Sequence, residues 1–185
     1  MVPLMSLWIP ILLSAVIVFV ASSVIHMLLR YHGNNFSRVK SEEEVMAALR
    51  PFGIPPGEYM MPFAGGSAQM KDPTYIAKLN QGPVAMVTVL PNGPFTMGKS
   101  LLLWFVYGVV VSVFAAYVAG RALPAGSPYP AVFRFAGATA FVGYALALWQ
   151  DSIWFRRSWT TTFKFTFDGL IYGLLTGGTF AALWP

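Results

Sequence analysis

Apolar residues occur in four long runs along the chain, at residues 7–29, 100–120, 130–150 and 162–184. Each run is long enough to cross a hydrocarbon core of about 30 Å, which takes about 20 helical residues. An amphipathic helix of a soluble protein carries a polar stripe along its length, and none of the four runs has one. The pattern predicts an all-α integral membrane protein, a bundle of four transmembrane helices in a single domain over residues 1–185.

The polar segment between the first two runs, residues 30–99, has the signals of a small folded subdomain. Ser41 and Glu44 match a capping box, in which each side chain bonds the backbone N–H of the other residue. This spacing predicts a short helix over residues 45–50, which Pro51 ends.

Further signals in the same segment predict a second helix and two strands. Asp72 and Pro73 suit the N-cap and first position of a helix, and Gly82 suits the position after its end. Residues 83–90 are rich in Val and Met and predict a strand, which residues 58–63 could pair with. We expect a small α+β cap on the bundle.

Composition supports a lipid environment for most of the chain. Hydrophobic residues make up 56% of the sequence and charged residues 10%, against about 25% charged in soluble domains. The chain has no cysteine, which excludes disulfides and thiolate metal sites. No Lys or Arg precedes Arg30, so we expect the first run to be a retained span rather than a cleaved signal peptide.

The basic residues predict how the helices are oriented. Cytoplasmic loops of membrane proteins are enriched in Lys and Arg. Only Arg121 and Arg134 lie near the second loop. The other ten basic residues lie in or beside the first and third loops: Arg30, Arg38, Lys40, Arg50, Lys71, Lys78, Lys99, Arg156, Arg157 and Lys164. We therefore expect a cytoplasmic loop over residues 30–99 and both termini outside.

Small residues recur at four-residue spacing in three of the four runs. Such stripes let helix backbones approach closely in lipid. The stripes indicate either helix packing within one bundle or a helix–helix interface with another subunit, which could be a second copy of this chain. For any single stripe we favour internal packing, whereas three stripes together make some contact between subunits plausible. The stripes contain Gly108, Ser112, Ala116 and Gly120; Ala136, Ala140, Gly143 and Ala147; and Gly169, Gly173, Gly177 and Ala181.

One pattern matches a nucleotide-binding motif but does not fit its chemistry. Residues from Gly93 to Ser100 fit the P-loop expression G-x-x-x-x-G-K-[ST]. A P-loop binds phosphates with successive backbone N–H groups, and Pro94 has none. The following helix is a predicted membrane span, with Lys99 at its start. We therefore expect no bound nucleotide, and we expect no nucleic acid either.

Ionisable residues inside a membrane are candidates for function. His26, Asp151, Lys164 and Asp168 all fall toward the predicted cytoplasmic end, and no acid falls at the middle of a run. Lys164 and Asp168 are four residues apart, so they could pair on one helix face. We interpret them as an interfacial ion pair that fixes the depth of the fourth helix.

His26 is the one candidate ligand for a haem or metal within the runs. A haem held by two histidines would need a second buried imidazole, and the only other one, His32, falls outside the first run. We predict no cofactor and no metal site, and expect His26 to bond to backbone or a lipid headgroup. A haem shared across a dimer stays open.

The segment before the fourth run is dense in aromatic and charged residues. It could bind an anionic lipid headgroup or a loop of a partner, or it could anchor the topology, and we leave these alternatives open. With two residues of the following run, the set consists of Trp149, Asp151, Trp154, Arg156, Arg157, Trp159, Lys164 and Asp168.

Two stretches resemble a group of uncharacterised bacterial inner-membrane proteins of about this length. They are residues 92–104, and residues 149–159 with the following Asp168 and Gly169. The resemblance implies a multi-pass protein of the bacterial inner membrane. It implies no activity and assigns no catalytic or ligand-binding residue.

Three functional hypotheses remain. The small-residue stripes, and the absence of a catalytic constellation, favour a non-enzymatic accessory subunit of a larger membrane complex or a self-associating component. Ionisable groups at both faces would suit a small transporter or channel as the alternative. The third hypothesis is a haem- or metal-binding membrane protein that uses His26.

Overall fold

The computed structural model describes residues 1–185, which divide into two compact units. The first, here called the bundle unit, comprises Met1–Phe36 and Thr96–Pro185. The second, here called the loop unit, comprises Ser37–Phe95. The loop unit is therefore inserted between the first two long helices, in the segment from which we predicted a cytoplasmic cap.

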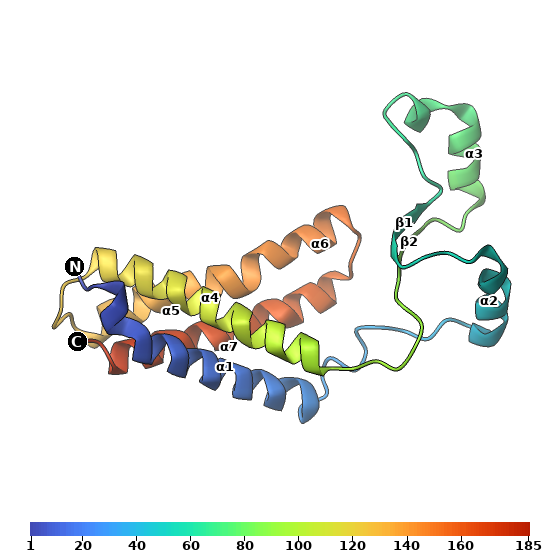
Figure 1. The fold of residues 1–185 in the computed structure, drawn as a ribbon. Helices are drawn as coiled ribbons and strands as arrows, with labels where there is room; N and C mark the ends of the chain where they lie inside the picture. Colours follow the sequence, from blue (N-terminus) through green and yellow to red (C-terminus); the bar gives the residue numbers. More distant parts are fainter. The chain divides into compact units, whose positions relative to one another are not determined.

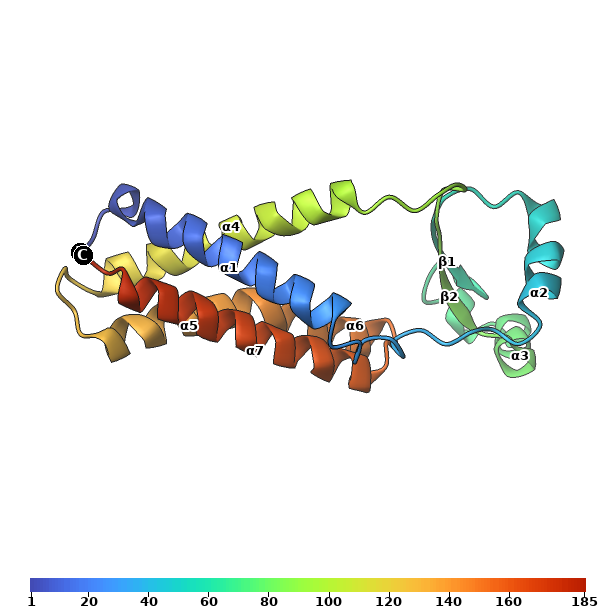
Figure 2. The same cartoon turned by 90° about the horizontal axis from the view of Figure 1, so that it is seen from below.

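Four long helices of the bundle unit lie alongside one another, as Figures 1 and 2 show. A short helix, α6, follows the third of them after one 3-10 turn. The predicted helical bundle is confirmed, with bounds α1 Trp8–Met27, α4 Gly98–Ala122, α5 Tyr129–Ala145, α6 Trp149–Trp154 and α7 Trp159–Ala182.

Three helical segments are long and apolar enough to cross a membrane: Leu4–Met27, Gly98–Ala122 and Tyr129–Trp154. The predicted fourth helix forms as α7, but it is not among these three. Lys164, Asp168 and several threonines lower its hydropathy. Most of those polar residues, including Asp168 and Thr176, are buried, and α7 packs most extensively against α5 and also against α1. Its polar side is thus turned toward the other helices.

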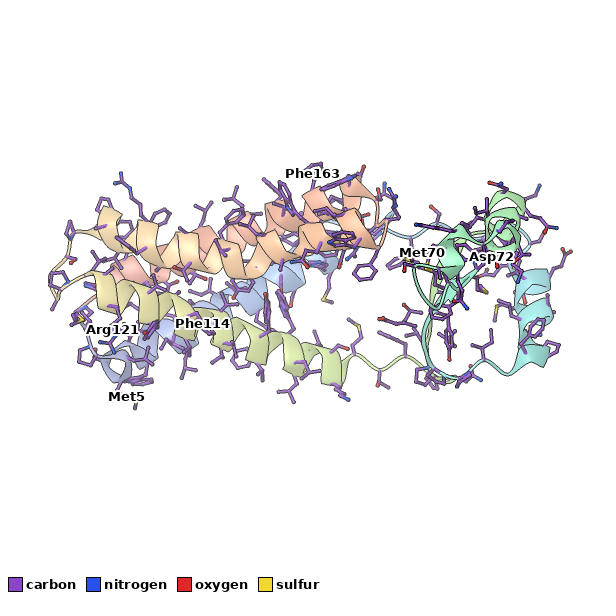
Figure 3. The ribbon with its side chains drawn as sticks, turned by 90° about the horizontal axis from the view of Figure 1, so that it is seen from above. Met5, Met70, Asp72, Phe114, Arg121 and Phe163 are labelled. Atoms are coloured by element: carbon purple, nitrogen blue, oxygen red, sulfur yellow. The ribbon has the colours of Figure 1, made fainter.

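Apolar side chains cover the outside of the bundle. Met5, Phe114 and Phe163 are each more than half exposed, and Figure 3 labels them along the unit. In water, exposed apolar surface of this extent is unusual for a monomer. Lipid chains would cover it without cost.

Glycines bring α5 and α7 into backbone contact. A Cβ added at Gly177 would lie 2.8 Å from the Phe133 carbonyl oxygen, and one at Gly173 would lie 3.0 Å from the Gly137 carbonyl oxygen. A Cβ at Gly169 would meet the Ala145 Cβ at 2.8 Å. Any side chain there would force the helices apart. The stripe of α7 is therefore used inside the chain.

The small-residue stripe of α4 faces α1 and the N-terminal segment. Gly108, Ser112, Ala116 and Gly120 are all buried. A Cβ on Gly108 would lie 3.8 Å from Ala15, and the Gly120 carbonyl accepts a hydrogen bond from the Val2 N–H at 2.8 Å. Packing within one chain accounts for this stripe as well, which is the interpretation that we favoured for a single stripe.

One end of the bundle, here called the terminal end, is closed by both chain termini. The Gly126 N–H donates to the Pro185 carbonyl at 2.7 Å, and the Trp184 indole N–H donates to the Pro124 carbonyl at 3.0 Å. Beside them lies an apolar cluster that includes Leu7, Val132 and Phe180, all fully buried. The opposite end, at which α1 ends and α7 begins, is here called the histidine end.

The loop unit has the predicted α+β composition. Strands β1 (Gly57–Met61) and β2 (Ala85–Val89) pair antiparallel, with Gly57 opposite Val89, which confirms the predicted pairing. Helix α3 (Pro73–Gln81) begins where expected, because the Asp72 carboxylate accepts a hydrogen bond from the Thr74 N–H at 2.7 Å. Asp72, which Figure 3 labels, is exposed, so this capping hydrogen bond lies at the surface of the loop unit. The strand before the Gly93–Ser100 pattern thus belongs to a two-stranded antiparallel sheet, unlike that of a P-loop.

The predicted capping box at Ser41 is wrong. Helix α2 (Glu42–Leu49) begins three residues earlier than expected, and the Ser41 side chain makes no capping hydrogen bond. Ser41 has a φ of +52°, in the left-handed region, whereas an N-cap residue needs an extended backbone to aim its hydroxyl at the first turn. The three glutamates Glu42, Glu43 and Glu44 in the first turn still suit the positive end of the helix dipole.

Candidate cation site

His26 lies in the last turn of α1 and has a defined tautomer. Its Nδ1 is 2.9 Å from the Ser22 carbonyl oxygen. A carbonyl oxygen only accepts hydrogen bonds, so Nδ1 carries a proton. Nε2 faces the Asp168 carboxylate and lies 4.0 Å from Oδ2, which is beyond hydrogen-bond distance. Nε2 is therefore the His26 atom that could bind a metal ion beside this carboxylate.

His32 is brought to the same place by a turn of the chain after α1. Its ring stacks on that of His26, with centroids 4.5 Å apart and planes 4° from parallel. It also packs on Phe165 of α7. Its Nε2 lies 2.8 Å from Asp168 Oδ2, and only 9% of its side chain is exposed. His32 follows the end of α1, as expected, but it lies beside His26 and is largely shielded from solvent.

Asp168 is the centre of this arrangement and is almost completely buried, with 1% of its side chain exposed. Oδ2 faces both histidines, whereas the buried Oδ1 has no hydrogen-bond partner. The three residues offer one ligand atom each within 4.8 Å of one another. We call His26, His32 and Asp168 the cation site.

His32 is neutral at pH 7 because its surroundings disfavour the charged ring. Burial, then the proximity of His26 and of the Lys164 ammonium, lower its pKa below the ordinary 6.5. Its Nδ1 lies 2.9 Å from the Asn35 amide nitrogen, which donates to it. With Nδ1 as acceptor, Nε2 carries the proton and donates to Asp168. This bond therefore joins a neutral imidazole to the carboxylate.

Lys164 does not pair with Asp168, contrary to the expected ion pair. Its ammonium donates to the Tyr31 carbonyl at 2.7 Å, to the Asn34 side-chain oxygen, and to Asn35 Oδ1 at 3.5 Å. These bonds hold the turn that carries His32 onto α7, one helical turn away from Asp168. Three acceptors also use all three ammonium protons.

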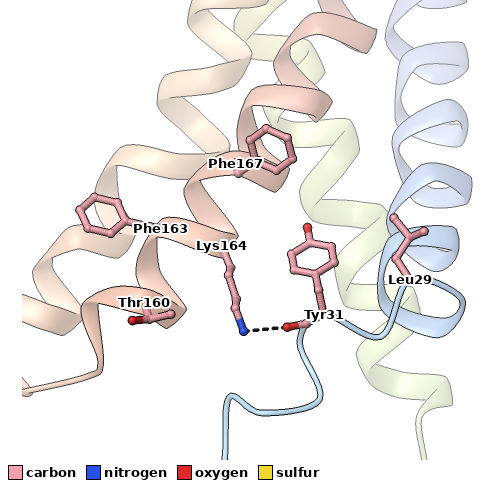
Figure 4. Close-up of a pocket in the computed structure, with 6 residues that line it drawn as sticks. All are labelled: Leu29, Tyr31, Thr160, Phe163, Lys164 and Phe167. Atoms are coloured by element: carbon pink, nitrogen blue, oxygen red, sulfur yellow. Dashed lines mark hydrogen bonds between the residues drawn. The ribbon is translucent and has the colours of Figure 1, made fainter.

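A mainly apolar groove of about 640 Å³ lies beside the hydrogen bond between Lys164 and Tyr31, as Figure 4 shows. Lys164, Tyr31 and Thr160 contribute its polar atoms, and the dashed line in Figure 4 marks the bond between Lys164 and Tyr31. The Lys164 ammonium already has three acceptors, so it offers no free proton to an anion in the groove. Its lining consists of Leu29, Tyr31, Thr160, Phe163, Lys164 and Phe167.

The donor set of the cation site suits a divalent transition metal. Two imidazole nitrogens and one carboxylate oxygen match zinc and its neighbours in the first row. Bonds of about 2.0–2.2 Å in tetrahedral geometry place ligand atoms about 3.3 Å apart. The observed separations of 2.8 Å and 4.0 Å from Asp168 Oδ2 lie on either side of that value. The two stacked rings would also have to tilt toward each other, because a metal ion lies in the plane of each imidazole that binds it.

A bis-histidine haem does not fit the same residues. Axial ligands approach haem iron from opposite faces of the macrocycle. The rings of His26 and His32 are stacked face to face and both point toward Asp168. No macrocycle fits between two rings that are 4.5 Å apart.

The charged residues of the aromatic segment form local contacts. Asp151 accepts from the Arg157 guanidinium at 3.1 Å, and that guanidinium lies 5.0 Å from the centre of the Phe165 ring. Asp151 is therefore paired outside the cation site. Arg156 is exposed and has a φ of +57°, where the chain turns between α6 and α7.

The tryptophans of this segment have two different environments. The Trp149 indole donates to Thr166 at 3.0 Å and packs edge-on against Trp159 at 6.1 Å. Trp154 is 70% exposed at the end of α6. The indoles thus lie around the histidine end, where an interfacial role remains a prediction.

The sequence analysis identified His26 and Asp168 as candidates, but it did not predict that His32 lies beside them. The available signal was turn chemistry, since Gly33, Asn34 and Asn35 follow His32 directly and such residues favour a chain reversal. A reversal immediately after α1 returns His32 to the level of His26.

Comparison with known proteins found no matching family model, no curated relative and no matching solved structure. The resemblance to bacterial inner-membrane proteins therefore stays a prediction. Residue roles in this chain rest on its own geometry.

Proposed function

We propose that this chain is a multi-pass membrane protein that binds a divalent transition metal ion through His26, His32 and Asp168. The observation that carries the proposal is the convergence of both imidazole Nε2 atoms on one buried carboxylate whose second oxygen has no partner. A metal ion would accept electron pairs from all three groups once the His32 proton moves from Nε2 to Nδ1 and the Asn35 amide turns its oxygen toward Nδ1.

The electrostatics of the site call for a cation. A buried carboxylate without compensation is expensive in an apolar interior. The neutral His32 supplies one hydrogen bond, whereas the His26 Nε2 lies 4.0 Å from Asp168 and is too distant to supply another. A bound divalent ion would join His26 and Asp168 through two metal–ligand bonds.

The surroundings of His26 resemble those of metal-bound histidines. Such rings donate their other N–H to a carbonyl or carboxylate, which fixes the tautomer, and His26 donates Nδ1–H to Ser22. His26 is 39% exposed, so an ion can enter from that side. Three protein ligands would leave one position of a tetrahedral ion open, and Zn²⁺ is the ion to test first.

The membrane arrangement belongs to the same proposal. We place all four long helices across a bacterial inner membrane, with both termini outside, on the three apolar helices and the buried polar side of α7. We also predict that the chain is an accessory subunit of a larger membrane complex or associates with a second copy of itself. A metal centre is compatible with such a non-enzymatic subunit.

Zn²⁺ titration of the purified protein in detergent tests the proposal. We expect one ion per chain, and at least about a hundredfold weaker binding for Asp168→Asn, because even outer-shell partners change metal affinity 10- to 100-fold. Asp151→Asn is the matched control, since Asp151 is paired with Arg157. Equal affinities of both variants and the unaltered protein would refute the proposal.

A further inference from the structure

Buried oxygen atoms without hydrogen-bond partners gather in the interior beyond Asp168. Four of them are Asp168 Oδ1, the Tyr172 and Tyr144 hydroxyls, and Thr176 Oγ1; a fifth is the hydroxyl of Tyr31. All of the first four side chains are at least nine-tenths buried. In natural proteins such groups are rare and are usually bonded to ordered water.

Three of these residues share one face of α7. Asp168, Tyr172 and Thr176 follow at four-residue spacing, which places them above one another. Helical side chains lean toward the N-terminus of their helix, so the Tyr172 ring leans toward Asp168. Tyr144 of α5 meets Tyr172 edge to face, with centroids 5.4 Å apart. The three residues on one face of α7 and Tyr144 of α5 are therefore neighbours, and we call them the polar series.

The series continues through α4 to α1. The Tyr144 hydroxyl lies 3.6 Å from the position that a Cβ on Gly108 would take. The Gly108 carbonyl accepts from Ser112 at 2.8 Å, and Ser112 contacts the Ser14 hydroxyl at 3.0 Å.

The series spans a large part of the bundle and then ends. Ser14 precedes His26 by twelve residues of α1, or about 18 Å at 1.5 Å per residue. Beyond Ser14, the fully buried side chains of Leu7, Val132 and Phe180 fill the terminal end. Toward the termini, the polar series is thus followed by apolar packing.

We infer that Asp168, Tyr172, Tyr144 and Thr176 hold a chain of buried water molecules that extends from the cation site into the bundle. A water molecule needs two to four polar partners, and each of these oxygens has a free bonding position. This inference goes beyond metal binding, because the water chain requires no ion.

Removing the hydroxyl of Tyr144 or Tyr172 tests whether it bonds a water molecule, because the two cases predict opposite changes in stability. A hydroxyl that bonds water contributes to stability, whereas deletion of an unsatisfied buried hydroxyl is neutral or stabilising. We expect Tyr144→Phe and Tyr172→Phe to lower the melting temperature by about 2–4 °C each. Tyr129→Phe on α5 is the control, because Tyr129 is exposed, and it should leave the melting temperature unchanged. Variants as stable as the unaltered protein, or more stable, would overturn the inference.

X-ray radiolytic labelling gives a second test that needs no variant. Hydroxyl radicals form from water, so they label side chains beside internal water even where the side chain is buried. We expect labelling of Tyr144 and Tyr172 and none of Leu7 and Phe180. Absence of label on both tyrosines would overturn the water chain. Zn²⁺ titration of the same sample keeps the two proposals separate, because a protein without metal binding can still show the labelled tyrosines.

Discussion

The packing of α7 against α5 predicts opposite effects for two adjacent glycines. A Cβ at Gly177 would lie 2.8 Å from the Phe133 carbonyl oxygen and 3.0 Å from the Gly137 Cα, both backbone atoms. At Gly178 the nearest atom is the Tyr129 hydroxyl at 3.5 Å, an ordinary contact. Alanine therefore fits at the second position and collides with a helix backbone at the first.

Gly177→Ala should destabilise the bundle relative to Gly178→Ala by about 1–3 kcal/mol, the usual range for an added methyl in a packed interior. Both variants exchange the same residue types in the same helix, so helix propensity cancels in the comparison. For a chain of this size each kcal/mol lowers the melting temperature by about 2–4 °C. The assay is near-ultraviolet circular dichroism during heating in detergent. Equal melting temperatures would show that α5 and α7 do not meet at Gly177.

Three further outcomes follow from individual contacts. Ser112→Ala leaves the Ser14 hydroxyl without its side-chain partner; for helices in lipid the loss should be about 0.6 kcal/mol, measured with Ser14→Ala in a double-mutant cycle, and a zero coupling energy would contradict it. The His32 imidazole should titrate below pH 6.5 in an NMR pH series of the metal-free protein. The free energy of unfolding should then decrease as the pH falls from about 6.5 to that lowered pKa, because only the unfolded chain takes up the proton in this window; a midpoint above 6.5 would refute the burial of His32. Asp72→Ala removes the acceptor of the Thr74 N–H, so hydrogen exchange at Thr74 should become faster while Zn²⁺ binding is unchanged.

Hydrophobic patterning predicted the helices of the bundle because each one is long and nearly free of charge. The four predicted runs became α1, α4, α7 and the combination of α5 with α6, and their ends shifted by a few residues. The strands β1 and β2 and the Asp72 cap were also predicted, since their signals are local. Among the predicted helix caps, the Ser41 capping box failed, because the backbone there has a left-handed conformation that the residue types do not reveal.

The candidate site was less predictable because it depends on contacts between distant segments. His32 and Asp168 are 136 residues apart in sequence, and the spacing of Lys164 and Asp168 on one helix favoured a different pair. Lys164 is instead bonded to the turn after α1. Local rules describe a helix face well, but they contain no information on which loop folds against it.

The glycine stripes illustrate a similar limit. The spacing of the small residues predicted where another helix packs closely. It could not show whether that helix belongs to the same chain or to another subunit. In the structure Gly173 faces Gly137, and Gly120 contacts Val2, so these positions are filled within one chain. In the third stripe, Gly143 and Ala147 are exposed, so part of the α5 stripe stays available for contact with another subunit.

X-ray absorption spectroscopy at the zinc edge of the Zn²⁺-loaded protein tests the cation site most directly. The account predicts two imidazole ligands with nitrogen at about 2.0–2.1 Å and oxygen ligands at about 2.0–2.2 Å, with the imidazole signal reduced to one ring in His32→Gln. A spectrum with sulfur ligands, or one without imidazole scattering, would contradict the assignment of His26, His32 and Asp168.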